Sequence, residues 1–287
     1  MSAGADPDEY RKASRDRWGK SAAGWRARRE QFARASMPVS ARMVDLVAPQ
    51  PGHALLELAA GIGDLGFLAA ELVEPGGSLI CSDFSPEMLS GAQERAAELG
   101  LSNVRFKQID AESIDLDAGS LDGVLCRWGY MLMADPSAAL RESRRVLRPG
   151  GRLALAAWTG PDENLWSAVP GRELVRRGLM ERPDPDAPGQ FAWSDARRIE
   201  AFLTDAGFVE DLEIARVAFT LDYPDFDAWW ATQRDLSSAF AETVDGLDPG
   251  TREEVRAAVR EASGQFESGS EGALSIPAAT WVAAATA

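Results

Sequence analysis

The sequence of 287 residues predicts an α/β fold with a mostly parallel sheet whose two faces are covered by helices. Three features predict it. Short apolar runs alternate with helical stretches from Pro51 to Trp158, a glycine-rich turn joins the first run to the first helix, and an alternating segment follows a proline-rich insertion. Near-continuous apolar strands are typical of parallel sheets, which are buried on both faces.

The first half of the chain predicts five strands and the helices between them. Pro86 opens one of these helices at its first turn, where a missing N–H is harmless. A turn from Arg148 to Gly151 ends another. The expected strands are 53–58, 78–82, 104–108, 121–127 and 152–158, and the expected helices are 64–73, 86–99 and 137–146.

An insertion and a further helix are predicted after Trp158. Residues 160–193 include a proline-rich stretch and one short helix. Ser194 is a good N-cap, and the helix that it begins runs to about Ala206, before Gly207.

The carboxy-terminal segments predict the remaining strands. Residues 208–221 alternate as one long strand, and residues 274–285 form another. We expect the two to pair antiparallel, with the polar helical stretch 224–266 as an excursion between them. The sheet then has seven strands, of which the last is antiparallel.

Residues 10–32 predict one or two amphipathic helices whose narrow apolar stripe contains Trp18 and Trp25. The many Arg residues of this segment fit either a solvated helix face or a site for an anionic surface.

Charge and composition exclude several classes of function. The chain has 30 basic and 45 acidic side chains, a net charge of −15, which argues against nucleic-acid binding because phosphate contacts need clustered Lys and Arg. We expect no membrane association and no secretory signal, since no apolar run reaches about 18 residues. Cys81 and Cys126 make no disulfide framework and indicate core thiols, rather than redox centres, in a reducing cytoplasm. No Cys/His cluster has the spacing of metal ligands, so no metal is expected.

A glycine triplet marks the candidate ligand site. Gly61, Gly63 and Gly66 follow the first strand as G-x-G-x-x-G, and Asp83 lies 83 − 63 = 20 residues beyond Gly63. This spacing matches the fingerprint of a Rossmann-type dinucleotide site, where the acidic residue binds ribose hydroxyls. The triplet alone is weak evidence, and the alternative role of Asp83 is the N-cap of the helix at 86–99.

Two further carboxylates change the expected nucleotide. Glu57 lies within the first strand, where it would repel a pyrophosphate and favour a cationic ligand by about 1 to 4 kcal/mol. Asp110 follows the third strand and is either an adenine ligand or a solvated loop residue. An adenosine joined to a cationic amino acid fits this set of carboxylates, and that ligand is S-adenosylmethionine.

Five ordered motifs carry a family resemblance: ELAAGIG, SDFSPEML, QIDAES, LDGVLCRWGYMLMADP and RVLRPGGRLALAAW. They resemble the class I S-adenosylmethionine-dependent methyltransferases, closest to the group that contains quinone-biosynthesis and small-molecule enzymes. The resemblance covers 40–158 strongly and 190–285 by architecture, and it implies a Rossmann-like fold. The residues that it implies for the methionine moiety are Glu57, Ala59, Gly61 and Gly63, and those for the adenosine are Asp83, Phe84, Met88, Asp110 and Ala111. Arg127 and Trp128 would face the sulfur. Ala59 and Ala60 depart from the family's usual Gly and Cys, so a displaced methionine tail is possible.

The chain then divides into four parts. These are lid helices at 1–40, a Rossmann-like core that binds S-adenosylmethionine at 41–223 with the cap insertion 160–193, a helical cap at 224–268, and the final core strand at 269–287.

The expected chemistry needs no acid–base pair. Methyl transfer from a sulfonium is an in-line displacement that alignment and desolvation accelerate. The single histidine, His53, begins the first strand at the end away from the glycine loop. Tyr130 is the best-placed tyrosine to orient an acceptor, and packing is its alternative role.

Aromatic residues carry the expectation for the acceptor. Six tryptophans at strand ends or in insertions would line its pocket or pack the lid, which favours a small, largely apolar molecule. They are Trp128, Trp158, Trp166, Trp193, Trp229 and Trp230. The amino-terminal helix, with Trp18 and Trp25, is expected to close over the cofactor as a second lid.

Two other functions stay open at this stage. An NAD-dependent oxidoreductase would need a proton relay that the sequence does not show, and a protein on the same scaffold could bind S-adenosylmethionine without methylating. The chain could be a monomer or a homodimer.

Overall fold

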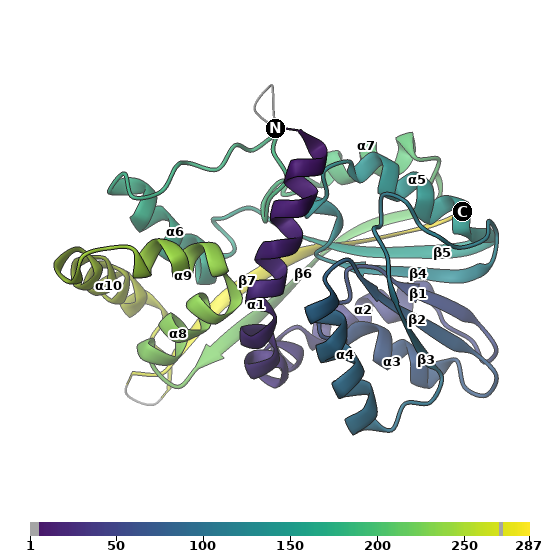
Figure 1. The fold of residues 1–287 in the computed structure, drawn as a ribbon, viewed down its shortest axis with the longest axis horizontal. Helices are drawn as coiled ribbons and strands as arrows, with labels where there is room; N and C mark the ends of the chain where they lie inside the picture. The colour runs from purple at the N-terminus through teal and green to yellow at the C-terminus, as the bar shows by residue number, and fades with distance from the viewer. Residues whose placement is uncertain (1–5, 270–271) are drawn as a thin grey trace.

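A seven-stranded sheet forms the centre of the computed structural model, which describes residues 6–269 and 272–287 (Figure 1). The strand order is β3-β2-β1-β4-β5-β7-β6, and β7 runs antiparallel to both β5 and β6 while the other pairs are parallel. The strands are β1 (Ala54–Glu57), β2 (Ser78–Asp83), β3 (Val104–Gln108), β4 (Leu121–Arg127), β5 (Leu147–Trp158), β6 (Glu210–Tyr223) and β7 (Leu274–Thr286). The expected fold class is therefore confirmed.

Helices cover both faces of the sheet. On one side α2 and α3 pack on the central strands and α4 packs on β2 and β3, while α5 and α7 pack together on the other side (Figure 1). These helices are α2 (Met37–Val47), α3 (Leu65–Leu72), α4 (Pro86–Leu99), α5 (Pro136–Val146) and α7 (Ala196–Asp205). This arrangement follows from right-handed crossovers between parallel strands, which reverse side where the strand order reverses at β1 and β4.

A helical cap lies at the extended ends of β6 and β7. It contains α6 (Leu165–Arg176), α8 (Phe226–Leu236), α9 (Ser238–Asp245), α10 (Pro249–Ser263) and the short 3₁₀ helix η2 (Gly264–Phe266). Tyr223 and Leu274 pair with each other where β6 ends and β7 begins. The helical segment that leaves the sheet between these two strands is thus the excursion expected from the sequence.

The amino-terminal segment differs from expectation in one way. The basic stretch is one helix, α1 (Pro7–Ala35), as expected, but it is followed by α2, which the sequence pattern did not reveal. Val39, Met43 and Val47 of α2 are buried in the same core as the sheet, and the expected boundary at residue 40 falls inside this helix.

α1 crosses between the cap and the sheet (Figure 1). Ion pairs join it to both sides: Arg26–Glu94 and Arg29–Glu98 to α4, Arg28–Asp235 to α8, and Lys20–Glu242 to α9. Each exposed pair contributes little alone. Together with the buried Phe32 and Ala22, these pairs favour a solvated helix face over a site for an anionic surface.

Candidate functional site

A cavity opens where the carboxyl ends of the strands meet α1. Glu57, Asp83 and Arg127 are the last residues of β1, β2 and β4, so parallel strands bring these three charged side chains to one edge of the sheet. The hollow, counted together with the open solvent at its mouth, is about 1070 Å³. Its lining comprises Tyr10, Arg11, Ser14, Trp18, Trp25, Glu57, Ala59–Ile62, Asp64, Asp83, Phe84, Met88, Ile109–Glu112, Arg127–Gly129 and Leu132–Ala134.

The glycine loop takes the backbone conformation that its sequence requires. Gly61 and Gly63 have φ values of +60° and +72°, a region that favours glycine. A Cβ on Gly63 would lie 2.4 Å from the Phe67 ring, and a Cβ on Gly66 would lie 2.4 Å from Glu57 Oε2. The three glycines therefore let the loop turn tightly and let α3 approach β1.

Asp83 holds this loop in place. Its carboxylate, on a residue 5 % exposed, accepts hydrogen bonds from the N–H groups of Gly61 and Ser85, each at 2.9 Å. Burial raises the pKa of Asp83 to about 6, although these backbone donors oppose the shift. The N-cap of α4 is Ser85, whose hydroxyl accepts from Met88 N–H, so the reading of Asp83 as that cap is wrong.

Glu57 is the most isolated charge-bearing group of the cavity. The residue is 2 % exposed, and its buried Oε2 atom has no hydrogen bond of normal geometry among the described residues. Burial raises the pKa of Glu57 to about 8, although the Arg127 charge and the Gly66 N–H oppose the shift. A buried carboxylate oxygen without a partner is suited to a ligand's ammonium group, so these residues fit the methionine end of S-adenosylmethionine.

Arg127 is held by other groups than Glu57. Its guanidinium donates to the hydroxyls of Ser36 and Ser40 at 3.0 and 2.7 Å, and it lies 3.6 Å from the Asp64 carboxylate. Asp64 precedes α3 without capping it, which leaves its carboxylate for this pair. The missed helix α2 thus supplies one of the two hydroxyls that position Arg127.

The backbone of Trp128 is strained, and stacking and a hydrogen bond hold its side chain in place. Its φ is +59°, which is rare for a bulky residue and is maintained only where the surroundings impose it. The indole stacks on Trp158 with ring centroids 4.3 Å apart and donates to Thr280 Oγ1 at 3.0 Å. Trp128 lines the cavity, and Trp158 lies behind it.

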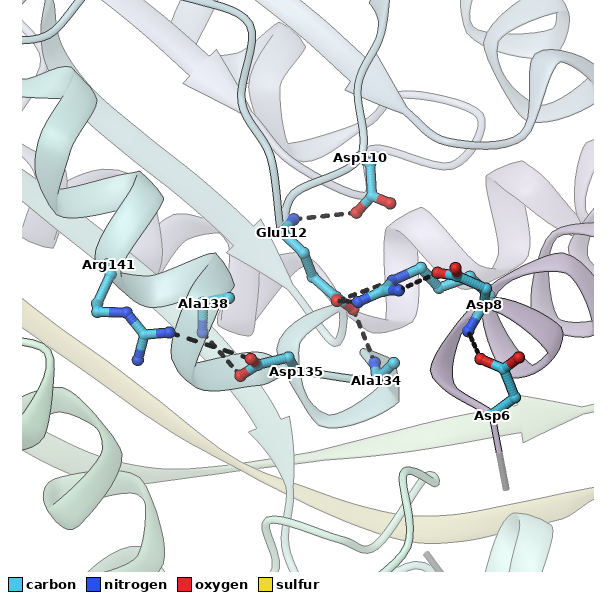
Figure 2. Close-up of polar contacts among 9 residues, drawn as sticks. Asp6, Asp8, Asp110, Glu112, Ala134, Asp135, Ala138 and Arg141 are labelled. Atoms are coloured by element: carbon cyan, nitrogen blue, oxygen red, sulfur yellow. Dashed lines mark hydrogen bonds and ion pairs between the residues drawn. The ribbon is translucent and has the colours of Figure 1, made fainter. Parts of the chain in front are cut away.

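The loops after β3 and β4 tie the cavity to α1. Glu112 accepts from Ala134 N–H at 2.8 Å and from Arg11 Nε at 2.9 Å, and Tyr10 donates its hydroxyl to Leu132 O at 2.8 Å. Figure 2 shows Glu112 between the loop that carries Asp110 and the loop that carries Ala134. The first turns of α1 are therefore fastened to two rims of the cavity.

Sequence reasoning missed most of this fastening. Tyr10, Arg11 and Ser14 gave no sequence signal, because a helical pattern does not specify which edge of the cavity the helix will contact. Glu112 lies in the QIDAES motif, and the position of its carboxylate two residues after Asp110 was the one sequence signal for its role at the rim.

The predicted cofactor residues gather at this cavity. Ala59, Gly61, Phe84, Met88, Asp110 and Ala111 line it together with the charged residues above, and Gly63 shapes the loop without lining it. Met88 and Ile62 form a small buried cluster against which Trp18 and Trp25 pack.

Five of the six tryptophans expected at an acceptor pocket lie outside this cavity. Trp166 packs on Trp158, and its carbonyl accepts from the Trp229 indole N–H at 2.9 Å. Trp193 stacks between Tyr130 and Phe202, and Trp230 packs against Phe226 and Phe240. Apolar residues in insertions pack the cap on the sheet as readily as they line a pocket, and the sequence does not distinguish the two.

Tyr130 also points elsewhere. It belongs to the 3₁₀ helix η1 (Tyr130–Leu132), is buried, and its hydroxyl lies 2.6 Å from Ser143 Oγ of α5. The geometry therefore favours packing over orientation of an acceptor.

The remaining candidate groups give no second site. His53 lies before β1, at the amino end of that strand, and Cys81 and Cys126 are buried, with the pKa of Cys126 raised by burial to about 12. Within residues 6–269 and 272–287, no three His, Cys, Asp or Glu side chains are arranged to hold a metal ion. No helix of this described part is long and apolar enough to cross a membrane.

Comparisons with known proteins agree with the geometry. A family model described as a methyltransferase domain matches residues 49–169. A ubiquinone/menaquinone biosynthesis C-methyltransferase (UbiE) of Cellvibrio japonicus is 32 % identical over 168 residues, which cover 55 % of this chain and 68 % of that protein. The nocamycin O-methyltransferase of Saccharothrix syringae is 39 % identical over 124 residues, 43 % of each chain.

A solved structure shares the fold. The YcgJ protein of Bacillus subtilis aligns with a TM-score of 0.55 and 20 % identity, covering 86 % of this chain and 97 % of that one.

Proposed function

Because the chain belongs to the class I S-adenosylmethionine-dependent methyltransferases, we propose that it transfers the methyl group of S-adenosylmethionine to a small, largely apolar organic molecule in the cavity beneath α1. S-adenosylmethionine is the methyl donor of this family, which argues against the NAD-dependent alternative. The detection of S-adenosylhomocysteine, described below, decides between methyl transfer and cofactor binding without methylation. The observation that carries the site is the buried Glu57 carboxylate, which lacks a partner where a cationic amino acid would supply one.

Each part of the cavity has a proposed role. Asp83 holds the ribose while it keeps the Gly61 N–H, and Asp110 with Ala111 borders the adenine. Glu57 faces the ammonium group, and Arg127 fixes Asp64 beside it. The bound cofactor supplies an electrophilic methyl group on a positively charged sulfur.

Catalysis in this proposal depends on position and exclusion of water. Trp128 just after β4, Met133 just after η1 and Trp18 from α1 supply an apolar wall to hold the acceptor in line. Alignment of reactants can supply several kcal/mol of the acceleration, and a dry site strengthens the effect of every charge in it. The α1 lid excludes water once Tyr10 and Arg11 are fastened to the rims.

The relatives support a small organic acceptor. One is named for ubiquinone and menaquinone biosynthesis and another for nocamycin. The aromatic residues in the lining of this cavity support the same class.

The free, buried state of Cys81 and Cys126 supports a reducing compartment such as the cytoplasm.

Two measurements test the proposal. Isothermal titration calorimetry should show S-adenosylmethionine binding to the wild-type chain, at least tenfold weaker binding to Asp83→Asn, and unchanged binding to Asp117→Asn, an exposed carboxylate outside the cavity. Mass spectrometry should then detect S-adenosylhomocysteine when the enzyme is incubated with a panel of phenols, quinols and hydroxylated naphthalenes. Absence of cofactor binding by the wild-type chain would refute the assignment of the site.

A further inference from the structure

The cavity contains a second buried polar atom without a partner, the indole N–H of Trp25. Among the described residues six buried side-chain nitrogen or oxygen atoms lack a hydrogen bond, and two of them belong to residues that line the cavity. These two are Glu57 Oε2, an acceptor that carries charge, and Trp25 Nε1, a donor. An α-amino acid group offers the matching pair, an ammonium and a carboxylate.

The position of Trp25 agrees with this pairing. Its ring packs against the cluster of Ile62 and Met88, and Ile62 is the residue between the two loop glycines. On its other side the ring meets Phe32 edge-on at 5.0 Å, and Phe32 lies 5.5 Å from Trp128 at the end of β4. Trp25 therefore lies between the glycine loop and the end of β4, over the part of the cavity assigned to the methionine moiety.

The charges of the lining make an added donor useful there. Five carboxylates line the cavity (Glu57, Asp64, Asp83, Asp110 and Glu112), against the two guanidiniums of Arg11 and Arg127. Arg11 is paired with Glu112, and Arg127 is held by Ser36, Ser40 and Asp64. The carboxylate of a bound ligand would therefore face an acidic lining whose two guanidiniums already have partners. A neutral N–H donor can bind that carboxylate without a counter-charge of its own.

The cost of leaving this N–H unmatched points the same way. A buried donor without an acceptor has lost its water and gained nothing in return, and in native proteins each such group calls for an explanation. Phenylalanine at this position would fill similar space without that cost.

We propose that Trp25 is a cofactor-binding residue whose Nε1–H donates a hydrogen bond to the carboxylate of the methionine moiety of S-adenosylmethionine. This inference rests on the cofactor site proposed above. It makes α1 part of the binding site, because the helix both covers the cofactor and binds the carboxylate of its methionine moiety.

The test compares two ligands that differ by the carboxylate alone. Calorimetry measures the Kd of S-adenosylmethionine and of decarboxylated S-adenosylmethionine for the wild-type chain and for Trp25→Phe. We expect Trp25→Phe to weaken S-adenosylmethionine about tenfold or more, as for a hydrogen bond to a charged group, and to leave decarboxylated S-adenosylmethionine within about twofold of wild type.

Trp281→Phe is the matched control. Its indole N–H donates to Ser194 O at 2.7 Å, away from the cavity, so this variant loses an indole donor without touching the site. It should bind both ligands as the wild type does.

The outcomes separate this inference from the proposed function. Equal weakening of both ligands by Trp25→Phe, or weakening of neither, overturns the hydrogen bond. Normal binding of the decarboxylated ligand by Trp25→Phe shows that the variant is folded. Failure of the wild-type chain to bind S-adenosylmethionine would refute the proposed function instead.

Discussion

Glu57 and Arg127 end the adjacent parallel strands β1 and β4, yet the Arg127 guanidinium pairs with Asp64 and leaves Glu57 Oε2 without a hydrogen bond. Ser36 and Ser40 hold Arg127 in this orientation. The ligand-free site therefore contains a carboxyl group that is easier to bury neutral than charged.

We predict that Glu57→Gln stabilises the ligand-free protein at alkaline pH. The pKa of Glu57 is about 8 in the folded protein and about 4.5 otherwise, so the folded state binds more protons between these values and loses stability as pH rises through this window. Glu57→Gln removes this loss. Urea unfolding at pH 5 and pH 9 should show a decline in stability for the wild type that is smaller by a few kcal/mol in the variant.

The same substitution should weaken S-adenosylmethionine binding at least tenfold, since the ammonium group loses its counter-charge. Glu71→Gln, an exposed residue of α3, is the control for both measurements. A variant that binds normally would mean that Glu57 does not face the ligand.

Cofactor binding should release a proton near pH 7. Glu57 is mostly protonated there in the ligand-free protein, and an adjacent ammonium group favours the ionised form. Calorimetry in buffers with different ionisation enthalpies measures the protons released, which should approach one for the wild type and fall sharply in Glu57→Gln. Equal release by both proteins would assign the titration to another group.

The fastening of α1 should control how long the cofactor stays bound. Arg11→Gln removes a partly buried pair with Glu112, worth about 1 kcal/mol, so we predict dissociation of S-adenosylhomocysteine about fivefold faster than from wild type. Stopped-flow fluorescence of the cavity tryptophans provides the rate. Lys12→Gln, the neighbouring exposed residue of α1, should leave it unchanged, and an identical effect of both changes would indicate a general electrostatic cause.

Tyr130→Phe should affect stability and spare binding. The substitution removes the contact with Ser143, at a cost of about 1 kcal/mol in the free energy of unfolding, while Ser143 keeps its bond to Ala139 O. Urea unfolding and calorimetry measure the two effects. A several-fold loss of turnover at unchanged stability would instead indicate that Tyr130 orients the acceptor.

Much of the fold followed from local patterns. The helix at 86–99 and the strands at 104–108 and 121–127 agree with the structure to the residue. Pro86 marks the first turn of that helix in the sequence. The sequence pattern did not reveal α2, and β5 begins earlier than expected because its first residues continue through a turn.

The tryptophans show where pattern reasoning ends. Trp128 and Trp229 were both expected at the acceptor pocket, yet one lines the cavity and the other donates its indole N–H to the Trp166 carbonyl. Which aromatic ring faces a ligand depends on the packing of α6 and α8 on the sheet, and that packing is a long-range property.

The sequence by itself determined the parallel strands, the glycine turn and the acidic residues at their ends, because these depend on residues close along the chain. Only the tertiary structure decided which residues of α1 line the cavity, that Arg127 turns to Asp64, and that Glu57 and Trp25 each keep an unmatched polar atom there. These contacts depend on how segments that are far apart in the sequence pack against each other in the folded chain. A local sequence pattern does not specify that packing.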